Sequence, residues 1–315
     1  MKFLILITAL PFALLGQGTS NIPSLQLKSV VFTVHGPDGN PVEGAFLEAS
    51  RRGPGNATGH TDSDGRLSLE LTQGASLHVY VSKDGYYNTG GEIWRGGMYK
   101  GPNRKLVARV VPDSFQILMK PVKNPLPLHY GSFRGIAPKY KRPVGFDLIR
   151  GDWISPFGKG QTADILFHFH DIHVDESGHK GTMTILFPNP DDGIQAFTAA
   201  RPFSREFGSD LAPPNEAPVD GYKSRLSYTI DHKQGDHYED YSVEGRNYLI
   251  RTRTERDAGG VLRKACYGWI EGEIEFDPRS RPGRGPQLKF TWYFNDDPNP
   301  DSRSLEFDRH VPKKQ

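Results

Sequence analysis

A series of short strand patterns near the start of the chain constrains the fold more than any other feature. Four segments alternate apolar and polar side chains with a period of two: 30–35, 45–49, 67–71 and 77–81. Sequences rich in Gly, Pro, Asn and Asp separate or follow them: 36–41, 61–65 and 83–86. Short strands that recur at roughly ten-residue spacing indicate a β-sandwich or a barrel. The chain is therefore predicted to be all-β, beginning with a small sandwich.

The first 18 residues have the pattern of a secretory signal peptide. Lys2 precedes an apolar run from Phe3 to Leu15, and small residues follow this run. The run is shorter than the roughly 20 apolar residues that a membrane-spanning helix requires. A buried core strand is the alternative interpretation. No Cys follows the run, so we expect no lipoprotein anchor, and we predict export to the periplasm or the cell exterior.

Composition and length narrow the functional classes. The 315 residues carry a formal net charge of +2, which is too small a field to favour nucleic acid as a partner. No later stretch is apolar enough to span a membrane, so we predict no integral span in the mature chain. The length suggests two domains, and three prolines within 121–127 mark the boundary. We therefore predict one domain at 19–122 and another at 123–315.

The first domain resembles a known family. The segments Gly36–Ala45, Thr61–Leu67 and Lys83–Tyr86 occur in the order in which the carboxypeptidase regulatory-like domain carries its GxDGxPVxGA, TDxxGxF and KxGY phrases. That domain is a transthyretin-like β-sandwich, and the resemblance covers residues 27–90. It implies a non-catalytic accessory module of the kind found in secreted bacterial proteins.

The second half of the chain also predicts strands, with antiparallel sheets and one face exposed to water. The expected strands are 107–120, which completes the first sandwich, and 163–169, 181–187, 248–255, 261–276 and 288–294. The pattern of Phe197–Phe207 predicts a short helix. The phrases at 124–128, 145–148 and 151–160 resemble a group of exported bacterial proteins with no assigned activity, which carry the same module in front. This second resemblance implies architecture and export only.

A cluster of histidines is the strongest candidate for chemistry. His168, His170 and His173 fall within one predicted strand, and a β-bulge near His170–Asp171 would place all three imidazoles on its outer face. Three imidazoles on one face could hold Zn²⁺ or Cu²⁺ with an open coordination position. A solvated, His-rich face is the alternative interpretation.

Two sets of acidic residues are weaker candidates. Asp297, Asn299 and Asp301 place oxygens at alternate positions, as Ca²⁺ prefers, but an ordinary polar turn is the preferred interpretation. Asp147 and Asp152 form a carboxylate pair that could serve general acid–base catalysis, with Trp153 and Lys159 beside them. For Trp153 the alternative is a core anchor.

Aromatic residues and one cysteine complete the candidates. Four aromatic residues after the first module could stack against sugar rings or cover the joint between the domains: Tyr86, Tyr87, Trp94 and Tyr99. Cys266, the single cysteine, is predicted to be a small buried hydrophobe rather than a nucleophile.

These observations favour an exported, non-enzymatic binding or structural protein of the cell envelope. A glycan or an envelope protein is the expected partner, and any cofactor is unknown. The alternative is a metal-dependent or carboxylate-dependent hydrolase in the second domain, with His168, His170 and His173 as its centre.

Overall fold

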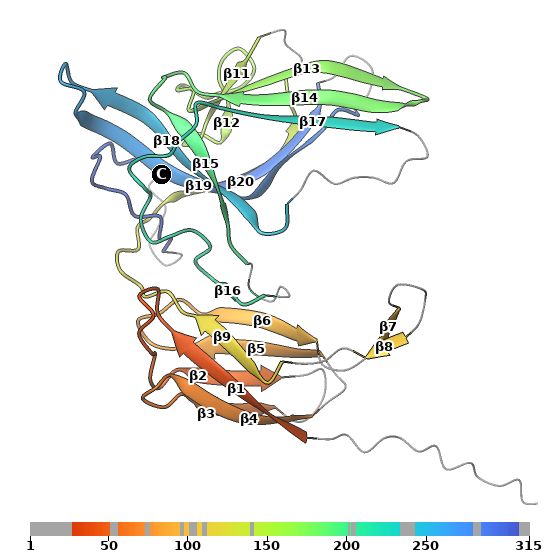
Figure 1. Ribbon diagram of the computed structural model, residues 1–315. Coiled ribbons are helices and arrows are strands. Elements are labelled where there is room, and N and C mark those ends of the chain that lie inside the picture. The colour runs from red at the N-terminus through yellow and green to blue at the C-terminus, as the bar shows by residue number, and fades with distance from the viewer. Residues whose placement is uncertain are drawn as a thin grey trace, which may run out of the picture.

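The computed structural model describes an all-β chain, as predicted (Figure 1). The described residues are 27–50, 56–72, 76–94, 98–100, 106–108, 112–138, 142–200, 202, 206–233, 243–279 and 285–308. Within these residues the secondary structure consists of strands, bridges and turns, and no helix long and apolar enough to cross a membrane is found. The predicted signal peptide lies outside the described residues.

The first module is a sandwich of two sheets. One sheet has the order β4 (Arg66–Thr72), β1 (Leu27–His35), β9 (Ser114–Leu118). The other contains β6 (Thr89–Trp94), β5 (Ser76–Ser82), β2 (Phe46–Ser50) and β3 (Ala57–His60). A separate pair joins β7 (Met98–Lys100) to β8 (Leu106–Ala108).

The alternation seen in the sequence fills the core between these two sheets. Val30, Phe32 and Val34 of β1 are fully buried, as are Leu47 of β2 and Val79 of β5. Each such side chain contributes about 1.5–3 kcal/mol by leaving water. The predicted strand pattern of this module is therefore confirmed.

Turn chemistry fixes the connection between β3 and β4, which passes from one sheet of the sandwich to the other. The Asp62 carboxylate accepts hydrogen bonds from the backbone N–H groups of Asp64 and Arg66, at 3.0 and 2.8 Å. Gly65 has φ +70°, and a Cβ built there would lie 2.3 Å from the Val34 carbonyl oxygen. Only glycine suits this position, because it combines a left-handed conformation with close backbone approach.

The second module is a larger sandwich of two five-stranded sheets. One sheet has the order β10 (His129–Ile136), β20 (Gln287–Asn295), β19 (Leu262–Asp277), β18 (Arg246–Arg256), β15 (Gly193–Thr198). The other has the order β12 (Asp152–Trp153), β11 (Val144–Asp147), β13 (Ile165–Asp175), β14 (Gly178–Leu186), β17 (Arg225–Lys233). Their inner faces form one aromatic-rich core, in which Phe146, Phe167 and Phe290 are at most 1% exposed.

A segment of the second module reaches down to the first. We call residues 206–223 the strap. Within it, β16 (Gly208–Ser209) pairs with β6 and becomes an edge strand of the first sandwich (Figure 1). The Phe207 ring packs edge-on against Phe115, with centroids 5.9 Å apart. The two modules are thus joined by a shared sheet as well as by the linker.

The end of β15 and the outer face of β19 correct two predictions. The helix expected at Phe197–Phe207 is wrong, because Phe197 and Thr198 end β15 and pair with β18. The second face of β19, expected to be wet, is largely covered: Tyr267 is fully buried and Trp269 is 5% exposed. Both pack with Ala217 of the strap and Leu305 near the C-terminal end, neither of which belongs to the sheet.

Candidate functional site

The predicted bulge in the histidine strand is confirmed. The register between β13 and β14 shifts between His170 and His173, and Asp171 has φ +53°. His168, His170 and His173 lie opposite Thr184, Thr182 and Lys180, so they share one face. The rings of His168 and His170 are 5.0 Å apart, but His170 bonds Asp171 through Nδ1 and Thr184 through Nε2.

These contacts do not make a metal centre. Across the described residues, no group of three or more His, Cys, Asp or Glu side chains is arranged to hold a metal ion. Both nitrogens of His170 already have partners. The three-histidine metal site and the hydrolase built on it remain predictions, which metal analysis of untagged protein would test.

The acidic segment after β20 forms a series of side-chain-capped turns. The Asn295 amide oxygen accepts from the N–H of Asp297, Asp297 accepts from Asn299, and Asn299 accepts from Asp301, at 3.0–3.2 Å. Each side-chain oxygen thus binds the backbone two residues on. These bonds support the polar-turn interpretation over the calcium loop.

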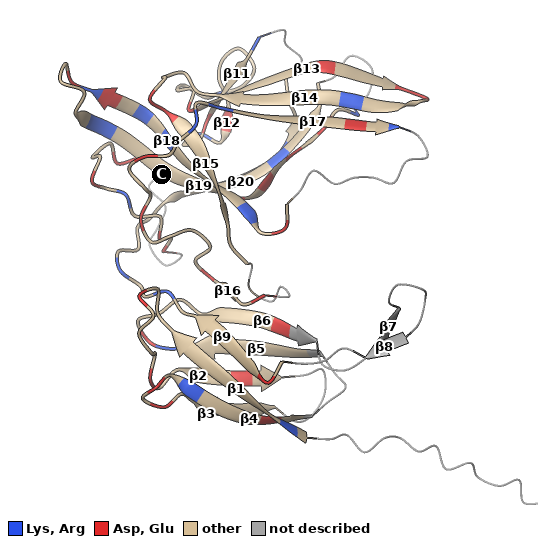
Figure 2. Cartoon of the chain, viewed as in Figure 1, with Lys and Arg blue, Asp and Glu red and all other residues tan. Residues whose placement is uncertain are grey.

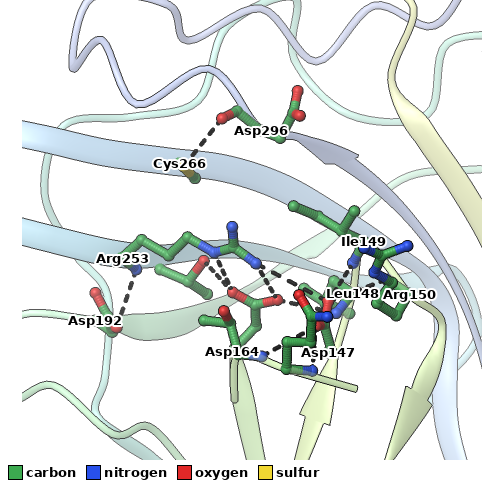
Figure 3. A network of polar contacts seen from close by, with 12 residues as sticks. Asp147, Leu148, Ile149, Arg150, Asp164, Asp192, Arg253, Cys266 and Asp296 are labelled. Atoms are coloured by element: carbon green, nitrogen blue, oxygen red, sulfur yellow. Dashed lines mark hydrogen bonds and ion pairs between the residues drawn. The ribbon is translucent and has the colours of Figure 1, made fainter. Parts of the chain in front are cut away.

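The carboxylates of Asp147 and Asp152 accept hydrogen bonds from the backbone, and Figure 3 shows Asp147 beside Ile149 and Arg150. Burial alone would raise the pKa of Asp147, but four backbone hydrogen bonds outweigh it and hold that pKa below its ordinary value. Their donors are the N–H groups of Ile149, Arg150, Gln161 and Thr162. Asp152 accepts from the N–H groups of Trp153 and Lys159 at 2.8 Å.

An ion pair with a buried carboxylate and a partly exposed guanidinium lies beside Asp147. The Arg253 guanidinium donates to both oxygens of Asp164, at 2.7 and 3.0 Å. Burial raises the pKa of Asp164, and the Arg253 bonds oppose that rise. Asp164 also accepts the N–H of Leu148, so the pair ties β18 to the segment around β11 (Figure 3). Trp153, 4% exposed, packs against Phe146 and Phe167, which confirms it as a core anchor.

Cys266 behaves as predicted from its position. It is 1% exposed, and burial raises the pKa of its thiol to about 12. The thiolate needed for nucleophilic attack is therefore scarce at neutral pH.

A row of aromatic side chains crosses the outer face of the β10–β20–β19 sheet. Tyr130, Tyr293 and Trp269 are direct cross-strand partners on three neighbouring strands. Tyr293 and Trp269 stack with centroids 4.2 Å apart and planes 5° apart, and Tyr130 lies 5.0 Å from Tyr293. Phe307 closes the group, 5.2 Å from Tyr293. Tyr130 at the edge is 42% exposed, so the row runs from the interior to water.

Polar side chains lie one step along the same strands. Ser132, Thr291 and Glu271 are cross-strand partners two residues from the aromatic row. Because side chains two residues apart share a face, this polar row faces the same way as the aromatic row. The Thr291 hydroxyl donates to Ser132 at 3.1 Å.

The strap converts part of this face into a pocket of about 470 Å³ between the modules. Its floor includes Trp269, Tyr293, Glu271 and Asn247 from the sheet. The remaining lining comes from the first module, the linker, the strap region and the C-terminal segment: Tyr87, Val122, Pro125, Pro202, Ser209, Asp210, Leu211, Ala212, Phe307 and Asp308. Trp269 is nearly buried, and its indole N–H finds no hydrogen-bond acceptor within the described chain.

A buried carboxylate holds the joint beside the pocket. Glu306, 1% exposed, accepts the hydroxyl of Tyr87 at 2.9 Å, the N–H groups of Lys123 and Asn124, and the amide of Asn215 at 2.8 Å. These donors belong to the first module, the linker and the strap. Glu306 therefore positions three parts of the pocket wall at once.

Lys120 fastens the strap from its other side. Its ammonium donates to the carbonyl oxygens of Leu211, Ala212 and Pro213, at 2.8–3.0 Å. Burial lowers the pKa of Lys120 to about 8. The lysine also borders a second pocket of about 410 Å³, which has Ser209, Leu211 and Ala212 in common with the first.

The aromatic residues singled out after the first module divide between two roles. Tyr87 covers the joint, as its bond to Glu306 shows. Tyr86 lies under the Lys83 ammonium, 5.8 Å from the ring centroid, and packs against the first core. The side chains of Trp94 and Tyr99 lie outside the described residues.

Sequence reasoning missed Tyr130, Trp269, Tyr293 and Glu271 as one group. Their alternation with buried residues was visible within each strand, but the sequence does not show which strands are neighbours. The distribution of charge does not indicate the site either, since basic and acidic residues are interspersed over both modules (Figure 2).

No family model and no curated protein sequence matches the chain. Among solved structures, the major pilin subunit BcpA of Bacillus cereus is 9% identical, with 84% of this chain and 95% of that chain covered and a TM-score of 0.24. A protein proposed to bind carbohydrate, from Bacteroides uniformis, is 11% identical, with 83% and 95% covered and a TM-score of 0.21.

Catechol 1,2-dioxygenase from Acinetobacter is 12% identical, with 34% of this chain covered and a TM-score of 0.23. The chain spans 56% of that enzyme and 62% of a chlorocatechol dioxygenase from Rhodococcus opacus. At these TM-scores the similarities carry no inference about function.

Proposed function

We propose that this is an exported, non-enzymatic binding protein whose ligand is a glycan held in the pocket between the modules. The observation that carries the proposal is the aromatic row of Tyr130, Tyr293 and Trp269 beside the polar row of Ser132, Thr291 and Glu271. Trp269, Tyr293 and Glu271 line the pocket, and the other three continue along the same sheet face outside it. Sugar rings present an apolar face and a rim of hydroxyl groups. A flat aromatic surface beside hydrogen-bonding side chains matches both features.

The pocket is also suited to binding because it is preformed. Glu306 and Lys120 fix the strap on both sides, so little ordering entropy remains to be lost when a ligand enters. In this proposal the first module is a carboxypeptidase regulatory-like accessory domain that supplies one wall. The apolar run at residues 3–15 directs export to the periplasm or the exterior.

A glycan array on the untagged mature chain tests the proposal, followed by calorimetry with the best-binding glycan. Replacing Tyr293 with Ala removes the centre of the aromatic row and should weaken binding about tenfold or more, the usual size of a central aromatic contact. Tyr130→Ala removes a half-exposed ring and should cost about threefold to tenfold without affecting folding.

Phe157→Ala is the matched control, because Phe157 is a 40% exposed aromatic residue beside β12 of the opposite sheet. It should leave affinity unchanged. If no glycan binds, or if all three variants bind as the wild type does, the proposal fails. A His168→Ala/His170→Ala variant separates the hydrolase alternative, because loss of a glycan-hydrolysing activity in that variant alone would favour an enzyme.

A further inference from the structure

The charges around the pocket indicate which sugars it accepts, given the proposed glycan-binding function. Its lining includes three carboxylates, Asp210, Glu271 and Asp308, and no Lys, Arg or His among the described lining residues. Glu306 does not add to this charge in the same way, because four donors already surround its carboxylate. Lys120 borders the strap from the other side, where three carbonyl oxygens hold its ammonium.

Glu271 is the carboxylate best placed to act on a ligand. It lies on β19 two residues from Trp269 and directly across from Thr291, at the point where the aromatic and polar rows meet. Its side chain is half-buried, and it forms no hydrogen bond or ion pair within the described chain. A partly desolvated carboxylate without a partner favours a cationic neighbour and opposes an anionic one.

Two other features of the pocket point to a ligand independently of its charge. Trp269 lines the pocket although it is only 5% exposed. Its indole N–H has no acceptor in the described chain. Tyr293, stacked on the nearly buried Trp269, brings an aromatic ring to the pocket lining near Glu271. A ring that bears both hydroxyl groups and a positive charge fits the aromatic and the acidic parts of this lining.

We propose that the pocket selects glycans containing a hexosamine with a free, protonated amino group and excludes uronic acids. In the bound state the amino group lies against the Glu271 carboxylate while the sugar ring covers Tyr293. Asp210 and Asp308 reinforce the preference through the negative potential of the pocket.

Calorimetry with three tetrasaccharides of the same linkage tests this selectivity: a β-1,4 glucosamine tetramer, the glucose tetramer and a β-1,4 uronate tetramer. The buffer is at about pH 5.5, where carboxylates of ordinary pKa are ionised. The wild type should bind the glucosamine tetramer about tenfold more tightly than the glucose tetramer. It should bind the uronate tetramer at least about tenfold more weakly than the glucose tetramer. Raising the salt to about 1 M should shrink these differences, because screening weakens the charge interaction.

Glu271→Gln keeps the shape of the side chain and removes its charge. It should reduce the glucosamine preference to about threefold or less while changing glucose affinity by less than about twofold. Glu275→Gln is the matched control, since Glu275 lies further along β19 and pairs with Lys289 at 2.7 Å outside the pocket lining. It should leave all three affinities as they are.

The outcomes separate this inference from the proposed function. Equal binding of glucosamine and glucose tetramers, or a preference that survives Glu271→Gln, overturns the selectivity but leaves glycan binding intact. Binding of the uronate tetramer as tightly as the glucose tetramer does the same. If none of the three tetramers binds, the selectivity is also overturned, and the glycan array then decides the proposed function separately.

Discussion

Glu306 provides the sharpest test of how the joint between the modules is held. The carboxylate is 1% exposed and accepts four hydrogen bonds, from Tyr87, Lys123, Asn124 and Asn215. Glu306→Ala removes the acceptor that these four donors share, and within the described chain only the Asn215 amide keeps another bond, to the Pro121 carbonyl oxygen. Such orphaned donors lose the bond and still pay for leaving water.

The size of the effect follows from these contacts. Hydrogen bonds to a charged group contribute about 1.5–3 kcal/mol each, so four independent bonds would contribute about 6–12 kcal/mol. They share one carboxylate and are not additive, and water can enter the space that Ala leaves. We therefore expect a loss of about 3–5 kcal/mol, which lowers Tm by about 6–20 °C for a module of this size.

Differential scanning calorimetry of the protein measures the change in Tm, and urea unfolding gives a second estimate of the lost stability. Glu216→Ala is the control: Glu216 is exposed and pairs with Arg303 at 2.9 Å, so its removal should cost no more than about 1 kcal/mol. Glu306→Gln should fall between the two, because one acceptor oxygen remains. A Tm for Glu306→Ala within about 2 °C of wild type would refute the reasoning.

Three further perturbations have defined outcomes. Gly65→Ala should cost at least about 1–2 kcal/mol in urea unfolding, because Ala disfavours φ +70° and its Cβ would meet the Val34 carbonyl; an unchanged midpoint would contradict this. Cys266, whose thiol pKa is raised to about 12, should resist a thiol reagent at about pH 8 in the native state and react fully in urea. Burial lowers the pKa of His179 below 6.5, so this histidine binds a proton more readily in the unfolded chain than in the folded one. The contribution of His179 to stability is therefore present above about pH 6.5 and is lost as the pH falls below that value. His179→Gln should flatten that acid slope, and an unaltered slope would assign it to other groups.

Much of the fold could be predicted because strand and turn signals are local. The period-two spacing of Val30, Phe32 and Val34 indicates that they share one buried face. The turn-forming residues around Gly65 indicate the turn in which it lies. The Asp257–Gly260 turn, which joins the paired strands β18 and β19, is a local signal of the same kind. Phe197 was misassigned because its burial depends on β18, which is distant in the sequence.

The candidate site was much less predictable, because it depends on which strands are neighbours and on what covers them. Tyr130, Tyr293 and Trp269 come from strands far apart in the sequence and meet through sheet order alone. The strap that closes the pocket carries no periodic signal, and its pairing with β6 crosses the module boundary. The His170 bulge was predictable because the apolar pattern slips by one residue within a single strand.

The most direct test of glycan binding between the modules uses the indole N–H signals of the four tryptophans in an ¹H–¹⁵N spectrum. A Trp269→Phe variant assigns the signal of Trp269, which lines the pocket and lacks an acceptor in the described chain. Titration with the best-binding glycan should shift the Trp269 signal and leave those of Trp153 and Trp292, both in the inner core, in place. Binding without a shift at Trp269 would contradict the account.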